Sequence, residues 1–280
     1  MTRKIAFQGE LGANSHIACR SVYPELEPLP CASFEDAFAA VSEGQAALAM
    51  IPIENSTAGR VADVHYLLPE SGLYIVAEHF EPIRHQLLGV RGATLADLKR
   101  VRSHPQALGQ CRKTLRALGL TPMKTADTAG AAREIAELGD PSEGALASAL
   151  AADVYGLDII KADVSDSALN TTRFIVLAPE PDDAEQGAGP CVTSFVFRVR
   201  SVPAALFKAL GGFATNGVNI TKLESYLVEG SFSAAQFYAD IEGHPDDRNV
   251  QLALQELKFF SAQLTVLGVY PAHPYRLAHP

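Results

Sequence analysis

The segment PEPDDAEQGAGP, at residues 179–190, constrains the fold of this 280-residue sequence more than any other feature. It is rich in proline, glycine and acidic residues, it has no apolar periodicity, and a strand-like run lies on each side of it. Such a composition is typical of a linker. Because 280 residues suffice for about two domains with separate cores, we expect one domain over residues 1–178 and a second over residues 191–271.

Before the linker, short apolar strands alternate with helix-like segments. Ser33 followed by the carboxylate of Asp36 indicates a capped helix, and Asn14 or Ser15 would cap an earlier one. The alternation predicts α/β layers with largely parallel sheets, and we favour two lobes because active sites commonly lie in clefts between lobes. The expected strands include residues 4–9, 46–55, 73–80, 85–90 and 121–124, and the expected helices cover residues 14–23, 33–44, 105–118, 128–138 and 148–155.

After the linker, the order of the predicted elements changes to strand, helix, strand, strand, helix, strand. The two central strands would be joined by a turn at Glu229-Gly230. A βαββαβ order over about 80 residues is a ferredoxin-like plan. The last ten residues, 271–280, contain three prolines, and we expect them to hang free.

Charge and composition exclude several classes of protein. The formal net charge is −9 with no long basic run, so we expect no nucleic-acid partner. No apolar stretch approaches the ~20 residues of a membrane span, and the N-terminus passes directly into a strand pattern, so we expect no membrane partner and no signal peptide. The four cysteines are far apart, which indicates reduced thiols and a cytoplasmic location. The histidines lack metal-ligand spacing, so we expect no metal site.

The first cluster of polar residues is FQGELGANS, at residues 7–15, where a strand passes through a glycine turn into a helix N-terminus. Free N–H groups and the helix dipole make such a turn a natural anion site. An ordinary tight turn explains the same residues equally well. The cluster lacks the GKS/T of a P-loop and the GxGxxG spacing of a dinucleotide fold, so nucleotide binding is not expected.

The second cluster is IPIENSTAGRV, at residues 51–61, where a core strand ends in polar residues. Ligands of open α/β sheets gather outside the carboxyl ends of strands, so the position suits a binding site. Gly59 is expected to open a helix, and capping of that helix by Ser56 or Thr57 is the alternative explanation.

The third cluster is RSHPQALGQC, at residues 102–111. Ser103 and Gln110 are seven residues apart, nearly two helical turns, so they can share one face. A simple helix cap at Ser103 before Pro105 is the alternative. A triad of Ser103, His104 and Glu54 is rejected, because no GxSxG elbow supports it.

The fourth cluster is LNTTRFIVLA, at residues 169–178, whose composition changes in the middle. Four polar residues, Asn170 to Arg173, precede an unbroken apolar run from Phe174 to Ala178. The run predicts a buried strand. The polar residues are either the ordinary start of that strand or a binding site at its end.

Together the four clusters resemble the motifs of the prephenate dehydratase family. The order GxxGxxS, IPIENS, SHPQALxQC and NxTRF carries this resemblance, and the C-terminal βαββαβ segment is similar to the regulatory ACT domain of that family. The resemblance covers the chain up to the tail. It implies a two-lobed α/β catalytic domain like a periplasmic binding protein, followed by the ferredoxin-like ACT domain.

The resemblance implies the conversion of prephenate to phenylpyruvate in L-phenylalanine biosynthesis, with loss of carbon dioxide and water and without a cofactor. Thr172 is expected to polarise the departing hydroxyl, and Glu54 is the alternative acid if burial raises its pKa. Arg173 would either pair with a substrate carboxylate or pin the loop to a protein acid. The expected catalytic residues are Thr172, Glu54, Asn55, Ser103 and Gln110, and the expected substrate-binding residues are Ser56, Thr57, Asn170, Arg173 and Ser15.

The C-terminal resemblance implies feedback regulation by L-phenylalanine and assembly as a homodimer or homotetramer. The family usually has ESRP on the facing strand of the effector site, whereas this chain has Glu224-Ser225-Tyr226-Leu227. The residues expected to bind the effector are Ala204, Ala205, Leu206, Phe207, Asn219, Leu223, Glu224 and Ser225.

Two other functions remain open from the sequence. An arogenate dehydratase, or an enzyme that accepts both substrates, would use the same motifs, because arogenate carries an amino group where prephenate has a keto group. A non-catalytic sensor of a small molecule would also suit a two-lobed α/β fold with an ACT domain.

Overall fold

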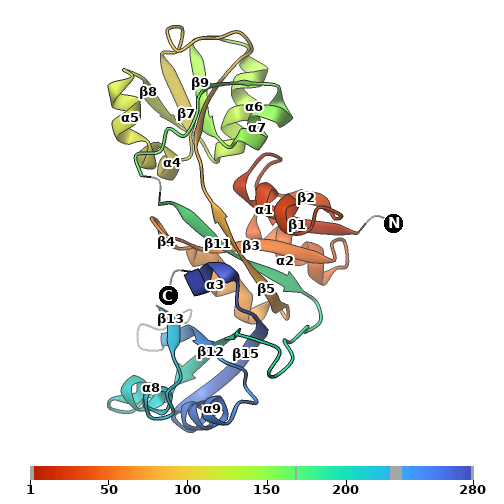
Figure 1. Cartoon of the computed structure of the whole chain (residues 1–280), viewed down its shortest axis with the longest axis vertical. Helices are drawn as coiled ribbons and strands as arrows, with labels where there is room; N and C mark the ends of the chain where they lie inside the picture. The colour runs from red at the N-terminus through yellow and green to blue at the C-terminus, as the bar shows by residue number, and fades with distance from the viewer. Residues whose placement is uncertain (1–2, 168, 228–234, 279–280) are drawn as a thin grey trace. The chain divides into compact units, whose positions relative to one another are not determined.

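The computed structural model describes residues 3–167, 169–227 and 235–278 (Figure 1). The chain forms two compact units that are not continuous in sequence. The first unit contains residues 1–64 and 79–174, and the second contains residues 65–78 and 175–280. The expected turn at Glu229-Gly230 lies outside the described residues, and the expected domain limits, 1–178 and 191–271, stay predictions.

The first sheet has the strand order β2-β1-β3-β11-β5, with the short strand β4 beside β3. Strand β1 pairs in parallel with both β2 and β3, and helices α1 and α2 pack against β1 and β3. The capping box expected at the start of α2 is present, since Ser33 and Asp36 each bond the other's backbone N–H. The bounds are β1 Lys4–Gln8, α1 Asn14–Val22, β2 Glu27–Cys31, α2 Phe34–Ser42, β3 Leu48–Asn55, β4 Gly59–Arg60, α3 Ala62–Leu67, a 3₁₀ turn Leu68–Glu70, β5 Tyr74–Pro82 and β11 Thr171–Ala178.

The second sheet of the first unit has the order β10-β6-β9-β7-β8. Strands β7, β8 and β9 are parallel, but β6 and β10 pair antiparallel, so the expectation of largely parallel sheets holds only in part. Two separate apolar clusters, one under α5 and one under α6 and α7, cover the two faces. The bounds are β6 Gln86–Gly89, β7 Arg100–Ser103, α4 Pro105–Gln110, α5 Arg112–Ala117, β8 Thr121–Lys124, α6 Thr128–Leu138, β9 Glu143–Ala147, α7 Ala149–Tyr155 and β10 Asp158–Lys161.

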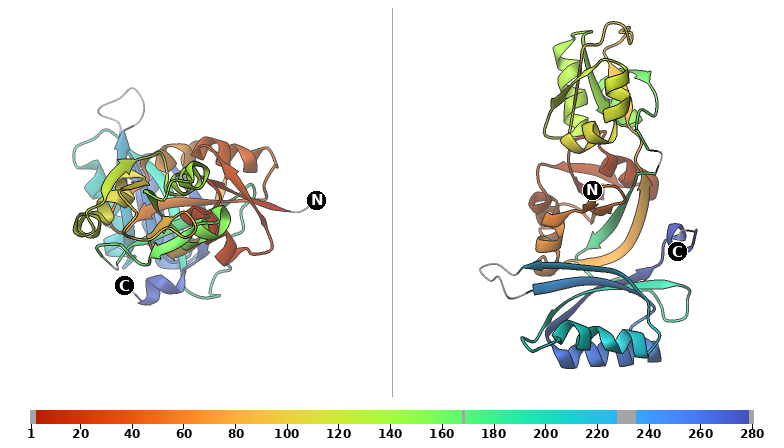
Figure 2. Two further views of the ribbon diagram at one scale, coloured as in Figure 1. Left: turned by 90° about the horizontal axis from the view of Figure 1, so that it is seen from above. Right: turned by 90° about the vertical axis from the view of Figure 1, so that its left-hand side faces the viewer.

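The C-terminal elements have the predicted ferredoxin-like βαββαβ order in an antiparallel sheet, β13-β14-β12-β15. Figure 2 shows helices α8 and α9 side by side on one face of this sheet. Phe195 of the sheet stacks on Phe213 of α8 and makes a tilted ring contact with Phe197, and all three are almost fully buried. The bounds are β12 Cys191–Val199, α8 Ala205–Thr215, β13 Ile220–Leu227, β14 Ala235–Glu242, α9 Arg248–Phe260, β15 Ser261–Pro271 and α10 Pro274–Ala278.

Residues 65–78 pack on the other face of the βαββαβ sheet, within the second unit. The rings of His65 and Tyr238 pack edge to face with their centroids 5.2 Å apart. The rings of Tyr66 and Tyr226 pack in the same way, with centroids 5.3 Å apart. Gly268 is so close to this segment that a Cβ atom there would lie 2.0 Å from the carbonyl oxygen of Ile75. Strand β15 therefore needs glycine at this position.

Four expectations about local structure are wrong. Gly59 opens no helix, because it pairs with Asn55 in a tight hairpin and the helix begins only at Ala62. Neither Asn14 nor Ser15 caps α1, since both lie inside it and Ala13 occupies the cap position. The helix expected over 105–118 is two helices, which meet at Cys111.

The tail is the fourth correction. Residues Pro274–Ala278 form α10, and Arg276 bonds the buried carboxylate of Glu78. The prolines gave no indication of this contact, because its partner lies 198 residues away in the chain.

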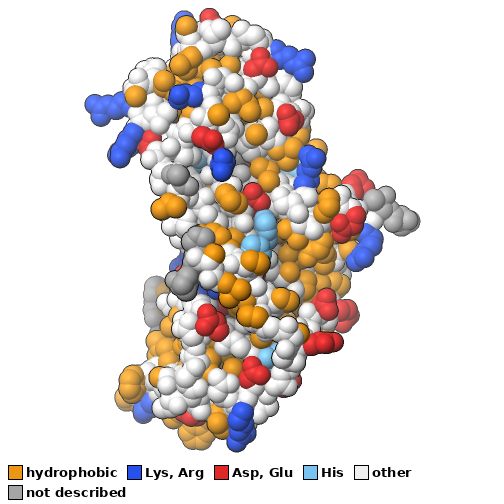
Figure 3. Space-filling model, in the orientation of Figure 1, with side chains coloured by type: hydrophobic (Ala, Val, Ile, Leu, Met, Phe, Trp, Pro, Cys, Tyr) orange, Lys and Arg blue, Asp and Glu red, His pale blue; other side chains and the backbone are white. Residues whose placement is uncertain are grey.

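No helix in the described part of the chain is both long enough and apolar enough to cross a membrane. On the face of the molecule shown in Figure 3, lysine and arginine side chains are scattered among acidic and apolar ones and form no continuous basic surface.

Candidate active site

A cavity of about 380 Å³ lies within the first unit. Its walls come from the ends of β1 and β3, the starts of α1, α4 and α6, the connection between β5 and β6, and the start of β11. Polar residues from all four sequence clusters take part. The side chains that matter for chemistry are those of Ser15, Asn55, His85, His104, Gln110, Asp127, Asn170 and Thr172.

Asn55 is held rigidly at the turn between β3 and β4. Its Oδ1 accepts hydrogen bonds from the backbone N–H groups of Thr57 and Ala58, both at 3.0 Å, and from the Thr57 hydroxyl at 2.7 Å. Asparagine is favoured at such turns because its side-chain oxygen can bond backbone groups two or three residues later. With Oδ1 occupied in this way, Nδ2 of Asn55 must point toward the cavity.

Asn55 Nδ2 donates to three residues from the fourth cluster, and the longest of these bonds, 3.4 Å, goes to the Thr171 carbonyl oxygen. The same nitrogen lies 2.8 Å from Asn170 Oδ1 and 2.9 Å from Thr172 Oγ1. Asn170 in turn donates through Nδ2 to Gln110 Oε1 at 3.1 Å, and Gln110 Nε2 donates to the Thr57 hydroxyl at 2.6 Å. The structure thus joins Asn55, Gln110, Asn170 and Thr172 in one hydrogen-bonded chain along the cavity wall.

The Thr172 hydroxyl is available as a donor. It is 9% exposed, it lines the cavity, and its oxygen accepts from Asn55. No described group accepts its proton. A hydroxyl whose acceptor side is occupied presents its O–H to whatever enters the cavity.

Ser15 lies in the first turn of α1 and also faces the cavity. It is 8% exposed, and within the described ranges its hydroxyl has no hydrogen-bond partner. The loop before it is fixed by two glycines in the left-handed region, Gly9 with φ 114° and Gly12 with φ 90°. At Gly12 a Cβ atom would lie 2.7 Å from the Cα of Ala151, so the loop needs glycine there.

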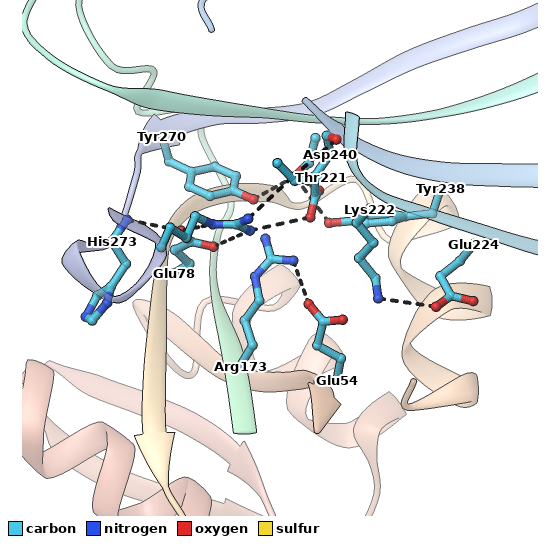
Figure 4. A network of polar contacts seen from close by, with 12 residues as sticks. Glu54, Glu78, Arg173, Thr221, Lys222, Glu224, Tyr238, Asp240, Tyr270 and His273 are labelled. Atoms are coloured by element: carbon cyan, nitrogen blue, oxygen red, sulfur yellow. Dashed lines mark hydrogen bonds and ion pairs between the residues drawn. The ribbon is translucent and has the colours of Figure 1, made fainter. Parts of the chain in front are cut away.

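Five predicted site residues lie outside the lining of the cavity, and one of them is Thr57, whose hydroxyl bonds Asn55 and Gln110. Ser103 is fully buried, and its hydroxyl donates to the Leu146 carbonyl oxygen at 2.7 Å. Glu54 and Arg173 bond each other at 3.0 Å (Figure 4), and a pairing of Arg173 with a protein acid was one of the two alternatives left open by the sequence. Ser56 accepts from the Thr171 backbone N–H at 3.0 Å and so ties the β3–β4 turn to β11.

The cavity is poor in fixed charge. Its lining residues, all of them described, include no lysine or arginine, and Asp127 is their one carboxylate. That carboxylate accepts the Gly130 backbone N–H at 2.6 Å and caps α6. In the described ranges no three histidine, cysteine, aspartate or glutamate side chains gather in a way that could hold a metal ion.

Comparison with known proteins identifies the family. The model of the family named "Prephenate dehydratase" matches residues 5–182, which is more than half of the chain. The chain belongs to the prephenate dehydratase family. The match contains all four polar clusters and ends at 182, before the βαββαβ elements begin.

Three similar proteins illustrate the relationship. A "Bifunctional N-acyl-homoserine lactone acylase/prephenate dehydratase" of Komagataeibacter europaeus is 52% identical over 98% of both chains. An "Arogenate dehydratase/prephenate dehydratase 1, chloroplastic" of Arabidopsis thaliana is 40% identical over 96% of this chain and 72% of its own. A solved structure of prephenate dehydratase from Arthrobacter aurescens in complex with L-Phe is 30% identical, with a TM-score of 0.87 over 96% of this chain and 90% of the other.

The predicted site residues left out three ionisable residues that line this cavity, His85, His104 and Asp127, and His85 is the most buried of them. It is 3% exposed, it lines the cavity, and its Nε2 lies 2.8 Å from Gln110 Oε1. In the sequence it is only the first residue of an apolar strand, HQLLGV. The available signal was a histidine at the entry to a buried strand, which resembles the polar mouth of the strand at 171–178.

The residues expected to bind an effector lie on two elements of the second unit. The start of α8 holds Ala204 to Phe207, with Ala204 in the left-handed region at φ 57° and Phe207 80% exposed. Strand β13 holds Leu223, Glu224 and Ser225, and just before it the Asn219 side chain donates to Glu242 at 3.1 Å.

Proposed function

We propose that this chain is a prephenate dehydratase that converts prephenate to phenylpyruvate in L-phenylalanine biosynthesis. The observation that carries the proposal is the Thr172 hydroxyl, fixed by Asn55 at a buried cavity wall with its proton free to donate. The reaction breaks the bond from the ring to its carboxylate, and the released electron pair expels the ring hydroxyl as the ring becomes aromatic. The departing hydroxide takes up one proton from solvent, so the products are phenylpyruvate, carbon dioxide and water.

Thr172 acts at the leaving oxygen. Because an alcohol is a weak acid, we do not expect Thr172 to transfer its proton before the bond to the leaving oxygen breaks. It acts as a hydrogen-bond donor to that oxygen. A fixed O–H aimed at the oxygen on which negative charge develops stabilises the transition state more than the ground state. Aromatisation supplies the driving force, and the hydroxyl lowers the barrier.

The carboxylates of the substrate bind without a cationic side chain in the cavity lining. Ser15 donates from the first turn of α1, where backbone N–H groups and the helix dipole also favour an anion. Asn170 and Gln110 hold the other end of the substrate through their carboxamides. This arrangement positions the reacting bonds rather than supplying net charge.

The remaining predicted residues act through their neighbours. Thr57 and Ser56 fix the β3–β4 turn that carries Asn55. Arg173 and Glu54 fix the start of β11 by their mutual ion pair, which makes Glu54 a scaffold residue in this proposal and not the acid. Ser103 fixes the end of β7, from which α4 and Gln110 follow.

Regulation by L-phenylalanine is the second half of the proposal, with residues 1–178 as the catalytic domain and 191–271 as an ACT domain. The Arthrobacter aurescens relative was solved in complex with L-Phe. The left-handed backbone of Ala204, a conformation that costs energy in a non-glycine residue, marks the start of α8 as a candidate effector loop. In this proposal the effector contacts Ala204, Ala205, Leu206 and Phe207 of one subunit and Asn219, Leu223, Glu224 and Ser225 of its neighbour.

This regulatory arrangement requires at least a homodimer, and a homotetramer satisfies it equally. The cytoplasmic location and the absence of a cofactor stay predictions from the sequence. So does the likeness of the catalytic lobes to a periplasmic binding protein.

Arogenate is an alternative substrate, because relatives from Arabidopsis thaliana and Petunia hybrida at 40% and 41% identity carry arogenate dehydratase in their names. A non-catalytic sensor is disfavoured by the family match and by the free Thr172 proton. Purified protein mixed with prephenate should form phenylpyruvate, which absorbs in base. No product from either prephenate or arogenate would reject the proposal.

Hydrolysis of an N-acyl-homoserine lactone is a second candidate, because the Komagataeibacter europaeus relative carries that activity in its name at 52% identity. The reaction adds water across the amide and releases a fatty acid. The geometry gives it less support: Ser103 is fully buried, and the neighbour of the Thr172 hydroxyl is an amide rather than a base. An assay of the same protein for release of homoserine lactone decides whether it has this hydrolytic activity in addition to the dehydratase activity.

A further inference from the structure

We propose that His85 is a positioning residue of this site, whose Nε2–H group holds the Gln110 carboxamide in the orientation on which the hydrogen-bonded chain to Thr172 depends. The effect on turnover rests on the function proposed above, whereas the structural part does not. His85 touches Gln110, and Gln110 is separated from Thr172 by two further carboxamides.

The location of His85 suits a fixed anchor. It lies between β5 and β6, and its backbone oxygen accepts from the Val164 N–H at 2.9 Å. Two residues earlier, the Ile83 N–H donates to the Asn170 backbone oxygen at 2.8 Å. The segment that carries His85 is therefore hydrogen-bonded directly to Asn170, the next residue of the hydrogen-bonded chain after Gln110. His85 itself is 3% exposed.

The direction of every hydrogen bond in the chain follows from two peptide groups. The backbone N–H groups of Thr57 and Ala58 can only donate, so the Asn55 atom that faces them is the oxygen. The amide nitrogen of Asn55 therefore faces Asn170 and Thr172. Because that nitrogen can only donate, the Asn170 atom facing it, 2.8 Å away, is again an oxygen.

The same reasoning continues to His85. The Asn170 nitrogen is left to face Gln110 at 3.1 Å, so the facing Gln110 atom is its oxygen. That oxygen lies 2.8 Å from His85 Nε2 and can only accept. Nε2 must therefore carry a proton, and a neutral His85 exists as the Nε2–H tautomer with an unprotonated Nδ1. The directions of the hydrogen bonds that join His85, Gln110, Asn170, Asn55 and Thr172 are therefore all fixed together. Reversing any one bond would place two donors or two acceptors against each other.

His85 supplies one of the two donors that hold Gln110 Oε1, and Asn170 supplies the other. Loss of the imidazole would leave this oxygen half satisfied and the carboxamide free to rotate. Since Gln110 also bonds the Thr57 hydroxyl, a rotated amide would disturb the turn that fixes Asn55. The consequence reaches Thr172 without any contact between Thr172 and His85.

The first test is spectroscopic and needs no substrate. A long-range proton–nitrogen correlation spectrum of the full chain with ¹⁵N-labelled histidine reports the tautomer of each imidazole, and H85Q identifies the His85 signals by their disappearance. We expect the neutral ring to carry its proton on Nε2. A proton on Nδ1, or both tautomers in exchange, would overturn the proposal whatever the enzyme does.

The second test is kinetic. H85L removes the donor, whereas H85Q keeps an N–H that can reach Gln110. We expect kcat of H85L to fall about 10- to 100-fold and H85Q to stay within about threefold of the unchanged chain. H244Q is the control, because His244 is also mostly buried at 9% exposure but belongs to the second unit, and it should leave kcat unchanged.

These outcomes separate the two proposals. If the unchanged chain turns over neither prephenate nor arogenate, the proposed function fails and the tautomer still decides the structural part. If the unchanged chain is active and H85L equals it, or if H85Q falls as far as H85L at equal folded fraction, the positioning role is refuted.

Discussion

Arg276 meets Glu78 through two parallel hydrogen bonds, Nε to Oε1 at 2.7 Å and Nη2 to Oε2 at 2.9 Å (Figure 4 shows Glu78 in this network). The Glu78 side chain is fully buried, and the Arg276 side chain is 16% exposed. The backbone N–H of His273 adds a third bond to the same carboxylate. A segment expected to hang free instead neutralises a buried charge.

R276A should therefore lower the free energy of unfolding by about 3 kcal/mol, since removing one partner of a buried pair leaves the other charge poorly compensated. The control is R84A. Arg84 pairs with Asp163, and the two side chains are 72% and 57% exposed. Exposed pairs contribute about 0–1 kcal/mol. Urea unfolding of both variants measures the difference, and equal losses would contradict this account of the tail.

Gly268 and Gly211 form a matched pair for a second prediction. G268A would place a Cβ atom 2.0 Å from the Ile75 carbonyl oxygen, whereas G211A adds a methyl group to open space within α8. We expect G268A to destabilise by more than about 3 kcal/mol or to prevent folding. G211A should be neutral or stabilising by about 0.5–1 kcal/mol, because alanine favours helix. Thermal unfolding checks both, and a tolerated G268A would show that residues 65–78 do not pack on β15 as described.

Two buried histidines predict a dependence of stability on pH. Burial lowers the pKa of His85 from its ordinary value of 6.5, partly offset by the Gln110 hydrogen bond, and burial together with Arg20 lowers the pKa of His16. The unfolded chain therefore binds more protons than the folded chain just below pH 6.5. The free energy of unfolding should keep its full value above this pH and decrease as the pH falls toward the lowered pKa values of His85 and His16 in the folded chain.

Urea unfolding between about pH 7.5 and about pH 5 isolates this effect, because exposed carboxylates stay ionised over that range. H85Q should show a smaller decrease than the unchanged chain. A free energy of unfolding that does not change over this range, or that rises toward acid pH, would contradict the burial of neutral imidazoles.

Ser15 allows a prediction about binding. S15A should raise KM for prephenate by about tenfold with little change in kcat, because the lost hydrogen bond to a carboxylate is present in both the ground state and the transition state. S56A is the comparison, since Ser56 bonds the Thr171 backbone and has no place in the cavity lining. An unchanged KM in S15A would remove Ser15 from the substrate site.

Much of the fold followed from local pattern, and the failures have a common physical origin. Ser33 and Asp36 are three residues apart, so their capping box was predictable. Gly59 was not, because the hairpin that it closes depends on pairing with β3 and not on its own neighbours. The contact between Arg276 and Glu78 spans 198 residues, and no local signal announces it.

The site divides in the same way. The sequence placed Asn55, Asn170 and Thr172 at strand ends and Gln110 on a later turn of a helix, and the fold brings all four to one cavity wall. Ser103 was expected on the same face as Gln110 through helical spacing, but it is the last residue of β7 and bonds the neighbouring strand. The helical spacing did not apply, because a strand ends between the two residues.

The most direct test of the central claim compares Thr172 variants in a steady-state assay with prephenate. T172A removes the hydroxyl, whereas T172S keeps it on a similar side chain. We expect kcat of T172A to fall by about 10³-fold with a small change in KM, and T172S to retain most of the activity. A T172A enzyme that turns over at nearly the normal rate would show that the Thr172 hydroxyl does not act at the leaving oxygen.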